Sequence, residues 1–288
     1  MKWINVKALA AKERIEVLEA WFWKHGALSV TIEDRSDRPI FEPPPGEHPL
    51  WNEVSVTGMF ESSISIEKIA MGLASDNHVL KNVESVEDRQ WEREWLSRFK
   101  PMQFGQRLWV LPTGFSIEPQ DKVIVELDPG LAFGTGTHET TRLCLEYLDS
   151  IEMAGSDVID YGCGSGILAI ASAKLGANRV IGVDNDRQAL AATKKNAERN
   201  LVVVDTCMPE VPLLPSDIVL ANILAKPLID LAPLLLNTLK PRGLLILSGI
   251  MTSQAEEIVE AYRDEPQFVE LVDRTELNGW MRLVWKKV

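Results

Sequence analysis

The sequence contains little cysteine, and what it has is scattered. Three residues in 288, Cys144, Cys163 and Cys207, are widely spaced and form no Cys-x-x-Cys pair. Domains held by disulfides carry an even and dense set of cysteines, and structural zinc sites use closely paired ones. Neither a disulfide framework nor a metal site is therefore predicted, and we expect three reduced thiols.

The sequence also lacks an unbroken apolar run that could cross a bilayer. The longest candidate, residues 218–236, contains Lys226 and Asp230 and is interrupted by Pro227 and Pro233. A spanning helix needs about 20 consecutive apolar residues. The N-terminal segment has no apolar core of the kind that signal peptides carry. These features predict a cytoplasmic protein without a membrane partner.

The sequence also has fewer basic than acidic residues. The chain has 30 Lys and Arg residues against 42 Asp and Glu, a formal net charge of -12. Such a chain repels phosphate backbones, so we expect no direct contact with nucleic acid and favour a basic polypeptide as partner. Simple solubility explains the charge equally well. The 288 residues allow one large domain or two unequal ones.

The first 86 residues repeat one pattern twice. Period-2 and period-3.6 hydrophobic stretches follow one another in the order strand, helix, strand. The expected elements are 3–8, 12–25 and 27–33, then 54–60, 66–74 and 79–86. This order predicts a small ferredoxin-like α+β domain over residues 1–86, a fold often used to bind macromolecules. Three consecutive prolines within Phe41–Gly46 predict a loop between the two halves.

Three aromatic residues mark the segment that follows. Trp91, Trp95 and Phe99 recur at i, i+4 and i+8, which places them on one face of a helix that ends near Pro101. We predict a linker helix over residues 87–101. An aromatic stripe at this spacing is more often a packing surface than a recognition site, so the expected role is to fix the pose of the two domains.

The rest of the chain, residues 102–288, alternates short β-rich runs with helical ones. Strands are expected at 158–160, 180–184, 217–221 and 244–248, and helices at 167–175, 188–200 and 227–239. Strands that alternate with helices are typical of an α/β domain with a doubly wound, Rossmann-like parallel sheet.

A glycine-rich turn, Asp160-Tyr-Gly-Cys-Gly-Ser-Gly166, follows the first of these strands. Gly162 and Gly164 carry no Cβ that would keep a ligand from the backbone, and we expect the next helix to offer free N–H groups at its start. A dinucleotide fingerprint needs G-x-G-x-x-G, but position 167 is Ile. The spacing D-x-G-x-G-x-G is instead the form that S-adenosylmethionine enzymes use. The alternative is a turn that merely lets the helix pack on the strand.

Two other strand ends carry polar residues. Asp184 lies 22 residues beyond Gly162 (184 minus 162), where a carboxylate can accept from both ribose hydroxyls. Asn222 follows the strand at 217–221 and reaches the same sheet edge, where cofactor and methyl acceptor must meet. The alternatives are a surface aspartate and a turn-forming asparagine. We predict that both residues bind the cofactor and that Asn222 is also catalytic.

A loop rich in glycine and hydroxyl groups, Leu127–Thr141, lies upstream and is expected to cover the cofactor. Phe133 is predicted to shield the sulfonium from water, and Thr141 to bind the methionine end; an N-cap is the alternative for Thr141. For His138 we favour a structural role in the loop. An imidazole with a pKa of about 6.5 is a weak base towards an ammonium group.

Three motifs together resemble the ribosomal protein L11 methyltransferase family, and the resemblance covers nearly the whole chain. They are Asp128-Pro-Gly-Leu-Ala-Phe-Gly-Thr-Gly-Thr-His138, the turn Asp160–Gly166, and Asn222-Ile-Leu-Ala-Lys-Pro-Leu228.

The resemblance implies a seven-stranded methyltransferase domain that uses S-adenosyl-L-methionine, with Thr141, Gly162, Asp184 and Asn222 at the cofactor. It also implies that the N-terminal domain grips ribosomal protein L11 while the C-terminal domain methylates lysine side chains and the α-amino terminus. We expect a monomer. One departure concerns the third strand, because residues 201–216 look short for this family; Asp205 and Thr206 would lie near the adenine if that strand forms.

Two other functions remain open. The first is methylation of a nucleobase or a glutamine amide, although those enzymes carry Asn-Pro-Pro-aromatic where this chain has Asn222-Ile-Leu-Ala225, and no aromatic residue is ready to stack on a flipped base. The second is a non-catalytic binding protein for ribosome assembly that kept the fold. The intact Asp184 and Asn222 argue against it.

Overall fold

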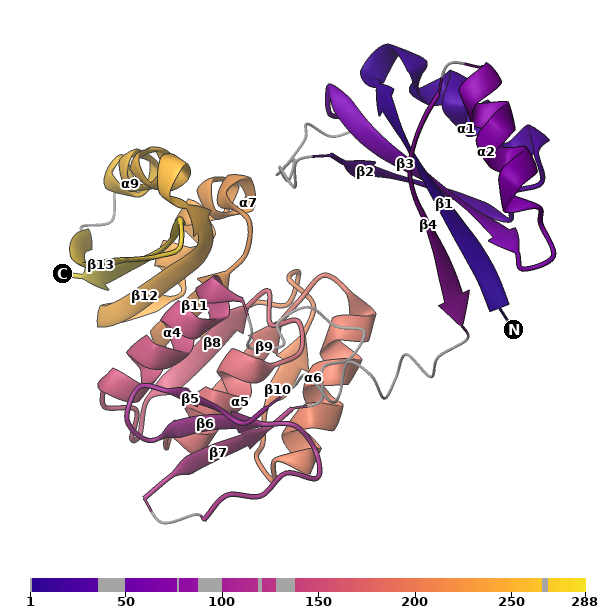
Figure 1. Cartoon of the computed structure of the whole chain (residues 1–288). Coiled ribbons are helices and arrows are strands. Elements are labelled where there is room, and N and C mark those ends of the chain that lie inside the picture. Colours follow the sequence, from indigo (N-terminus) through magenta and orange to yellow (C-terminus); the bar gives the residue numbers. More distant parts are fainter. Residues whose placement is uncertain are drawn as a thin grey trace. The chain divides into compact units, whose positions relative to one another are not determined.

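The computed structural model describes residues 2–35, 50–76, 78–87, 100–118, 121–127, 138–265 and 269–288. The chain divides into two compact units, Met1–Glu94 and Trp95–Val288, and each is described by itself (Figure 1). Most of the predicted linker helix, with its three aromatic residues, lies outside the described residues, as do the loop Phe41–Gly46 and Phe133.

The N-terminal unit is a four-stranded antiparallel sheet with two helices. Its elements are β1 (Lys2–Ala11), a 3-10 turn (Lys12–Arg14), α1 (Ile15–Lys24), β2 (Ser29–Asp34), β3 (Glu53–Glu61), α2 (Ile66–Ser75) and β4 (Val79–Glu87). The strand order is β2-β3-β1-β4, and every pair is antiparallel. Two β-α-β units interleaved in this order make the ferredoxin-like fold, so the predicted fold is confirmed.

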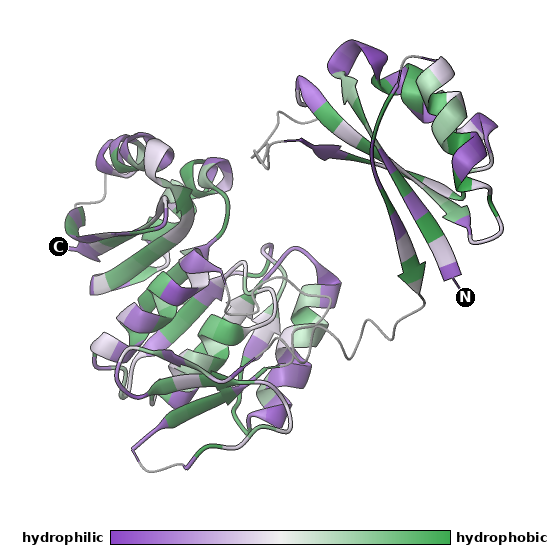
Figure 2. Ribbon diagram, viewed as in Figure 1, coloured by the Kyte–Doolittle hydropathy of each residue, from purple (hydrophilic) through white to green (hydrophobic). Residues whose placement is uncertain are grey.

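Both helices cover the same face of this sheet. Along β1, Ile4, Val6 and Ala8 are buried beneath them, and the more exposed residues between them belong to the other face. Figure 2 shows the alternation of hydropathy along the strands of this sheet. Helix α1 packs closely because the sheet has Gly58 beneath Phe22, where any Cβ would collide with the phenyl ring. The opposite face of the sheet has no helix from the described residues over it (Figure 1).

The C-terminal unit contains a seven-stranded and a three-stranded sheet. Its strands are β5 (Met102–Phe104), β6 (Leu108–Leu111), β7 (Val123–Glu126), β8 (Asp157–Tyr161), β9 (Arg179–Val183), β10 (Asp205–Cys207), β11 (Ser216–Asn222), β12 (Leu239–Met251), β13 (Val269–Leu277) and β14 (Trp280–Lys287). Its helices are α4 (Glu139–Ser150), α5 (Ile167–Lys174), α6 (Arg187–Arg199), α7 (Ala225–Asp230), α8 (Ala232–Asn237) and α9 (Ala255–Arg263).

The large sheet has the order β10-β9-β8-β11-β12-β14-β13. The first five are parallel, and β14 is antiparallel to both of its neighbours. Adjacent residues of β8 belong to the hydrophobic cores on opposite faces of the sheet. Val158 packs in the core with α4 and α5, and Ile159 in the core with α7, α8 and α9. From β8 the strands β9 and β10 are added on one side and β11 and β12 on the other, so the strand order reverses between β8 and β11. Ligands bind at such a switch point. The predicted doubly wound, seven-stranded fold is confirmed.

Local details differ from the prediction. The single helix expected at 227–239 is two short ones, because Pro233 lies at the start of α8 and cannot donate a backbone hydrogen bond. The doubtful third strand does form, as β10, which pairs with β9 through Asp205 and Thr206. No described helix is long and apolar enough to cross a membrane.

Candidate functional site

The glycines of the turn after β8 have a left-handed backbone. Gly162, Gly164 and Gly166 have φ values of 80°, 55° and 81°, which side chains with a Cβ rarely adopt. A Cβ at Gly162 would collide with the side chain of Ile223, and one at Gly166 would lie 2.8 Å from Cγ2 of Thr193. At these two positions glycine is therefore required by packing within the protein.

The backbone N–H groups of this turn donate within the protein. The N–H groups of Gly162 and Cys163 donate to the Val183 carbonyl at 2.7 and 3.0 Å, and that of Gly164 donates to Asp184 Oδ2 at 2.9 Å. At the start of α5, where we expected free N–H groups, the Ile167 N–H donates to Ser165 Oγ at 3.3 Å and the Ala169 N–H to Asp160 Oδ2 at 3.0 Å. These hydrogen bonds within the protein fix the conformation of the turn.

Asp160 is the buried carboxyl beneath this turn, with only 1% of its surface exposed. Burial raises the pKa of Asp160 to about 7; the Ala169 N–H opposes this shift, and the negative charge of Asp184 adds to it. The group therefore titrates near neutral pH.

Asp184 follows β9 directly and is half-buried. Its Oδ2 accepts from the Gly164 N–H and its Oδ1 from the Asp186 N–H, both at 2.9 Å. A carboxylate offers about four lone-pair sites, so two acceptor positions remain that no described residue fills. The two backbone donors fix the carboxylate beside the glycine turn, as binding of a ribose diol requires.

Asn222 and Thr141 come together from distant parts of the sequence. Asn222 ends β11, Thr141 lies in the first turn of α4, and the Asn222 side-chain N–H donates to Thr141 Oγ1 at 3.4 Å. Ala221 pairs with Tyr161, so Asn222 lies level with Gly162. The carboxyl edge of the sheet therefore brings together Thr141, Gly162 and Asn222.

Thr141 is not the N-cap of α4. That position belongs to His138, whose Nδ1 accepts from the Thr140 N–H at 3.3 Å. The His138 ring also lies edge-on to Trp280, with centroids 4.7 Å apart. His138 thus orders the start of α4, and Thr141, 2% exposed, keeps its hydroxyl at the site.

A row of polar side chains on α6 was missed by the sequence prediction. Thr193 Oγ1 donates to the Gly164 carbonyl at 3.0 Å, and Asn196 Nδ2 to the Ser165 carbonyl at 2.8 Å. Asn200 Nδ2 donates to the Glu126 carbonyl at 2.7 Å, and its Oδ1 accepts from the Glu126 N–H at 2.8 Å. These residues lie at i, i+3 and i+7, on one face of the helix. Polar residues at this spacing were the signal in the sequence that could have predicted their role.

The whole chain is similar to known proteins. A model of the ribosomal protein L11 methyltransferase (PrmA) family matches residues 2–288. The chain belongs to this family. The ribosomal protein L11 methyltransferase of Vibrio parahaemolyticus is 45% identical over 296 residues, covering 100% of this chain and 99% of that relative. The one of Edwardsiella ictaluri is 47% identical over 293 residues and covers 98% of each.

A solved structure agrees with this assignment. The crystal structure of ribosomal protein L11 methylase from Lactobacillus delbrueckii subsp. bulgaricus matches with a TM-score of 0.59 at 32% identity, and the match covers 66% of this chain and 99% of that one. The PrmA family consists of methyltransferases dependent on S-adenosylmethionine. The site suits this cofactor, because the Asp184 carboxylate lies beside the glycine turn and keeps acceptor positions that no described residue uses.

Proposed function

We propose that this PrmA family member transfers methyl groups from S-adenosylmethionine to lysine side chains and the α-amino terminus of ribosomal protein L11. The observation that carries the proposal is the convergence of Asp184, the glycine turn, Thr141 and Asn222 on one sheet edge, in a chain that matches the family from residue 2 to 288. We also propose a cytoplasmic location, which is supported by three free cysteines.

Each residue of the edge has a distinct part in holding the cofactor. The open acceptor positions of Asp184 would take the two ribose hydroxyls. Gly164 would let the ligand lie against the backbone, and Gly162, whose missing Cβ makes room for Ile223, would border the ligand with its backbone. Thr141 Oγ1 would bind the methionine end. When bound, S-adenosylmethionine supplies a methyl group on a positively charged sulfur. The same assignment places Phe133 over that sulfur, at a position outside the described residues.

The hydrogen bond between Asn222 and Thr141 supports a role for Asn222 in orienting the amine that accepts the methyl group. Because its side-chain N–H donates to Thr141, its side-chain oxygen remains to accept a hydrogen bond from the incoming amine. A lysine ammonium has a pKa of about 10.4, so it must first lose a proton, which water takes. The Asn222 side-chain oxygen and the backbone carbonyl that follows would accept hydrogen bonds from the amine and so direct its lone pair towards the methyl group. Positioning rather than covalent catalysis carries the reaction.

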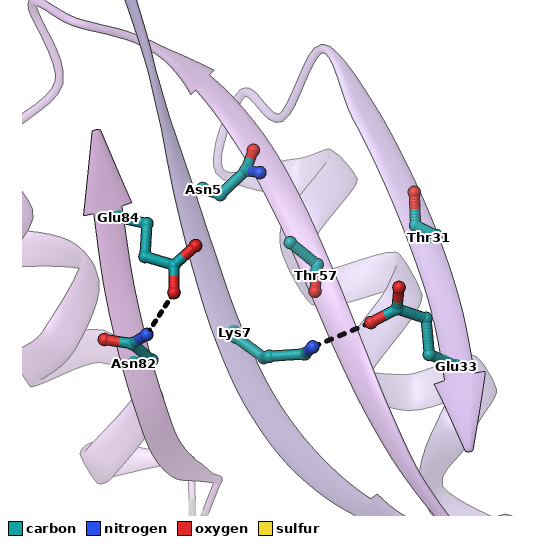
Figure 3. Close-up of a pocket in the computed structure, with 7 residues that line it drawn as sticks. All are labelled: Asn5, Lys7, Thr31, Glu33, Thr57, Asn82 and Glu84. Carbon is teal, nitrogen blue, oxygen red and sulfur yellow. Dashed lines mark hydrogen bonds and ion pairs between the residues drawn. The ribbon is translucent and has the colours of Figure 1, made fainter. Parts of the chain in front are cut away.

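The N-terminal domain, predicted over residues 1–86, would hold the protein substrate on the open face of its sheet. That face has a hollow of about 250 Å³ lined entirely by polar side chains (Figure 3). Glu33 and Glu84 line it against a single cation, Lys7, whose Nζ lies 2.7 Å from Glu33 Oε2. The resulting negative charge suits a basic polypeptide.

Intact-mass spectrometry tests this function. Purified ribosomal protein L11 is incubated with the protein and S-adenosylmethionine, beside an Asp184→Ala control. Mass gains of whole methyl units with the wild type alone are the expected result. No gain, while calorimetry shows that the cofactor binds, would remove ribosomal protein L11 as the target and favour a binding protein.

A further inference from the structure

Ile223, the residue after Asn222, lies against two glycines that are far apart in the sequence. One is Gly162 in the turn after β8, and the other is Gly249 in β12. Both have positive φ, 80° and 83°. The segment Asn222–Ile223 therefore passes between two glycines, one in the turn after β8 and one in β12.

The contact with Gly162 is made by the Ile223 side chain. A Cβ at Gly162 would collide with Cγ2 of Ile223 and lie 3.8 Å from its Cβ. Gly162 cannot move away easily, because its N–H donates to the Val183 carbonyl at 2.7 Å. The Cγ2 methyl of Ile223 thus rests on the cofactor turn and sets its distance from β11.

The contact with Gly249 is made by the Ile223 backbone. A Cβ at Gly249 would collide with the carbonyl oxygen and lie 2.7 Å from the carbonyl carbon, well inside the ordinary carbon contact of about 3.5–4.0 Å. Gly249 belongs to an irregularity of β12, where the pairing with β14 shifts between Leu247 and Ile250, as a bulge built on a left-handed glycine does. Any side chain at this position would displace the Ile223 carbonyl.

The bulge is itself held in place. Ser248 pairs with Asn222 across β11 and β12, and its Oγ donates to the Met281 carbonyl at 2.9 Å while the residue is fully buried. The Asn222–Ile223 segment therefore has a fixed neighbour on each side.

We infer that Ile223 is a positioning residue: held between Gly162 and Gly249, it sets where the Asn222 amide and the following carbonyl stand relative to the cofactor turn. This inference rests on the proposed function of Asn222. A displacement of about 1 Å at such a site can cost about 10²-fold in rate, so losing either contact should lower kcat more than it lowers cofactor affinity.

Substitutions at Ile223 give the direct test. Ile223→Val keeps a methyl at Cγ2, and we expect near-normal kcat; Ile223→Ala removes that methyl, and we expect kcat to fall about tenfold or more. The KM for cofactor and the melting temperature should change far less in both. Equal kcat for the two variants would overturn the inference.

A second pair separates the collision at Gly249 from simple backbone strain. Gly155 also has positive φ, 75°, but a Cβ there would meet no atom within 4 Å. Gly249→Ala should lose at least tenfold more kcat than Gly155→Ala. If the two variants lose the same, backbone strain explains the effect and the contact with Ile223 does not.

A double variant tests the contact without turnover. Gly162→Ala should weaken cofactor binding, measured by calorimetry, and adding Ile223→Ala should restore part of it by removing the methyl that the new Cβ meets. This readout stays valid if ribosomal protein L11 is not the target. An absence of any recovery would contradict the proposed contact.

Discussion

The four-stranded and the seven-stranded sheet place their polar side chains in different ways. In the N-terminal sheet they alternate along the strands, because the described helices cover one face only, and Lys7, Thr57 and Glu84 point to the other. The seven-stranded sheet is covered on both faces, so its functional polar residues, Asp184 and Asn222, stand where strands end. An open face suits a large partner, whereas a strand-end crevice suits a small ligand. Substitutions in the two regions should therefore impair different properties of the protein.

The largest effect is expected at the strand end of β11. Asn222→Ala should lose about 10²–10³-fold in kcat, as removal of a single positioned polar group does in other enzymes. Cofactor affinity should fall much less. The measurement is the rate of methyl transfer at saturating cofactor, and a near-normal rate would remove Asn222 from catalysis.

The next effect is on cofactor binding. Asp184→Ala removes a charged acceptor for two hydroxyls, at roughly 1.5–3 kcal/mol each, so cofactor affinity measured by calorimetry should fall about a hundredfold or more. Asp186→Ala is the matched control. Asp186 is exposed and caps α6 by accepting from the Gln188 N–H, so its loss should cost about 1 kcal/mol of stability and little affinity.

Variants of the open face should change substrate affinity alone. Reversing two charges with Glu33→Lys and Glu84→Lys should raise the KM for ribosomal protein L11 about tenfold at low salt, with less effect at high salt. Cofactor affinity and kcat should remain. An unchanged KM would show that this face does not contact the substrate.

The smallest effect concerns stability, and it compares the two ends of β8. The pKa of Asp160 is raised to about 7 by burial, so the folded state holds its proton more tightly than the unfolded state and loses stability as pH rises from about 4 to about 7. The melting temperature of Asp160→Asn relative to that of the wild type should therefore rise across that pH range. Above it the difference between the two should stay constant.

Asp157, at the other end of β8, provides the opposite sign. Hydrogen bonding to Lys240, at 2.9 Å, lowers the pKa of Asp157. Its stabilisation is present above the ordinary pKa of the carboxyl and is lost on acidification. Asp157→Asn should fall behind the wild type at neutral pH and approach it in acid. The same pH trend in both variants would contradict this account.

The sequence predicts most of the fold because its signals are local. The alternation of Ile4, Val6 and Ala8 and the residues between them predicted β1, and the glycine spacing predicted the turn after β8. Strand ends likewise pointed to Asp184 and Asn222. The small sheet β5-β6-β7 and the strands β13 and β14 were not predicted.

The missing parts depend on tertiary contacts that no local pattern encodes. The need for glycine at position 249 comes from the Ile223 carbonyl, which approaches it from another strand. The bonded N–H groups of the turn and of the start of α5 depend on Val183 and Asp160, which lie beneath them. The role of Thr193 appears only once α6 packs on the turn.

The most direct test of the whole account offers the protein a choice of substrates. Unmethylated large-subunit ribosomal proteins are incubated as a mixture with the protein and S-adenosylmethionine labelled in its methyl group, then separated. The account predicts label in ribosomal protein L11, on lysine and at the α-amino terminus, and none in the other proteins. Label in a different protein, or in none while the cofactor still binds, would contradict it.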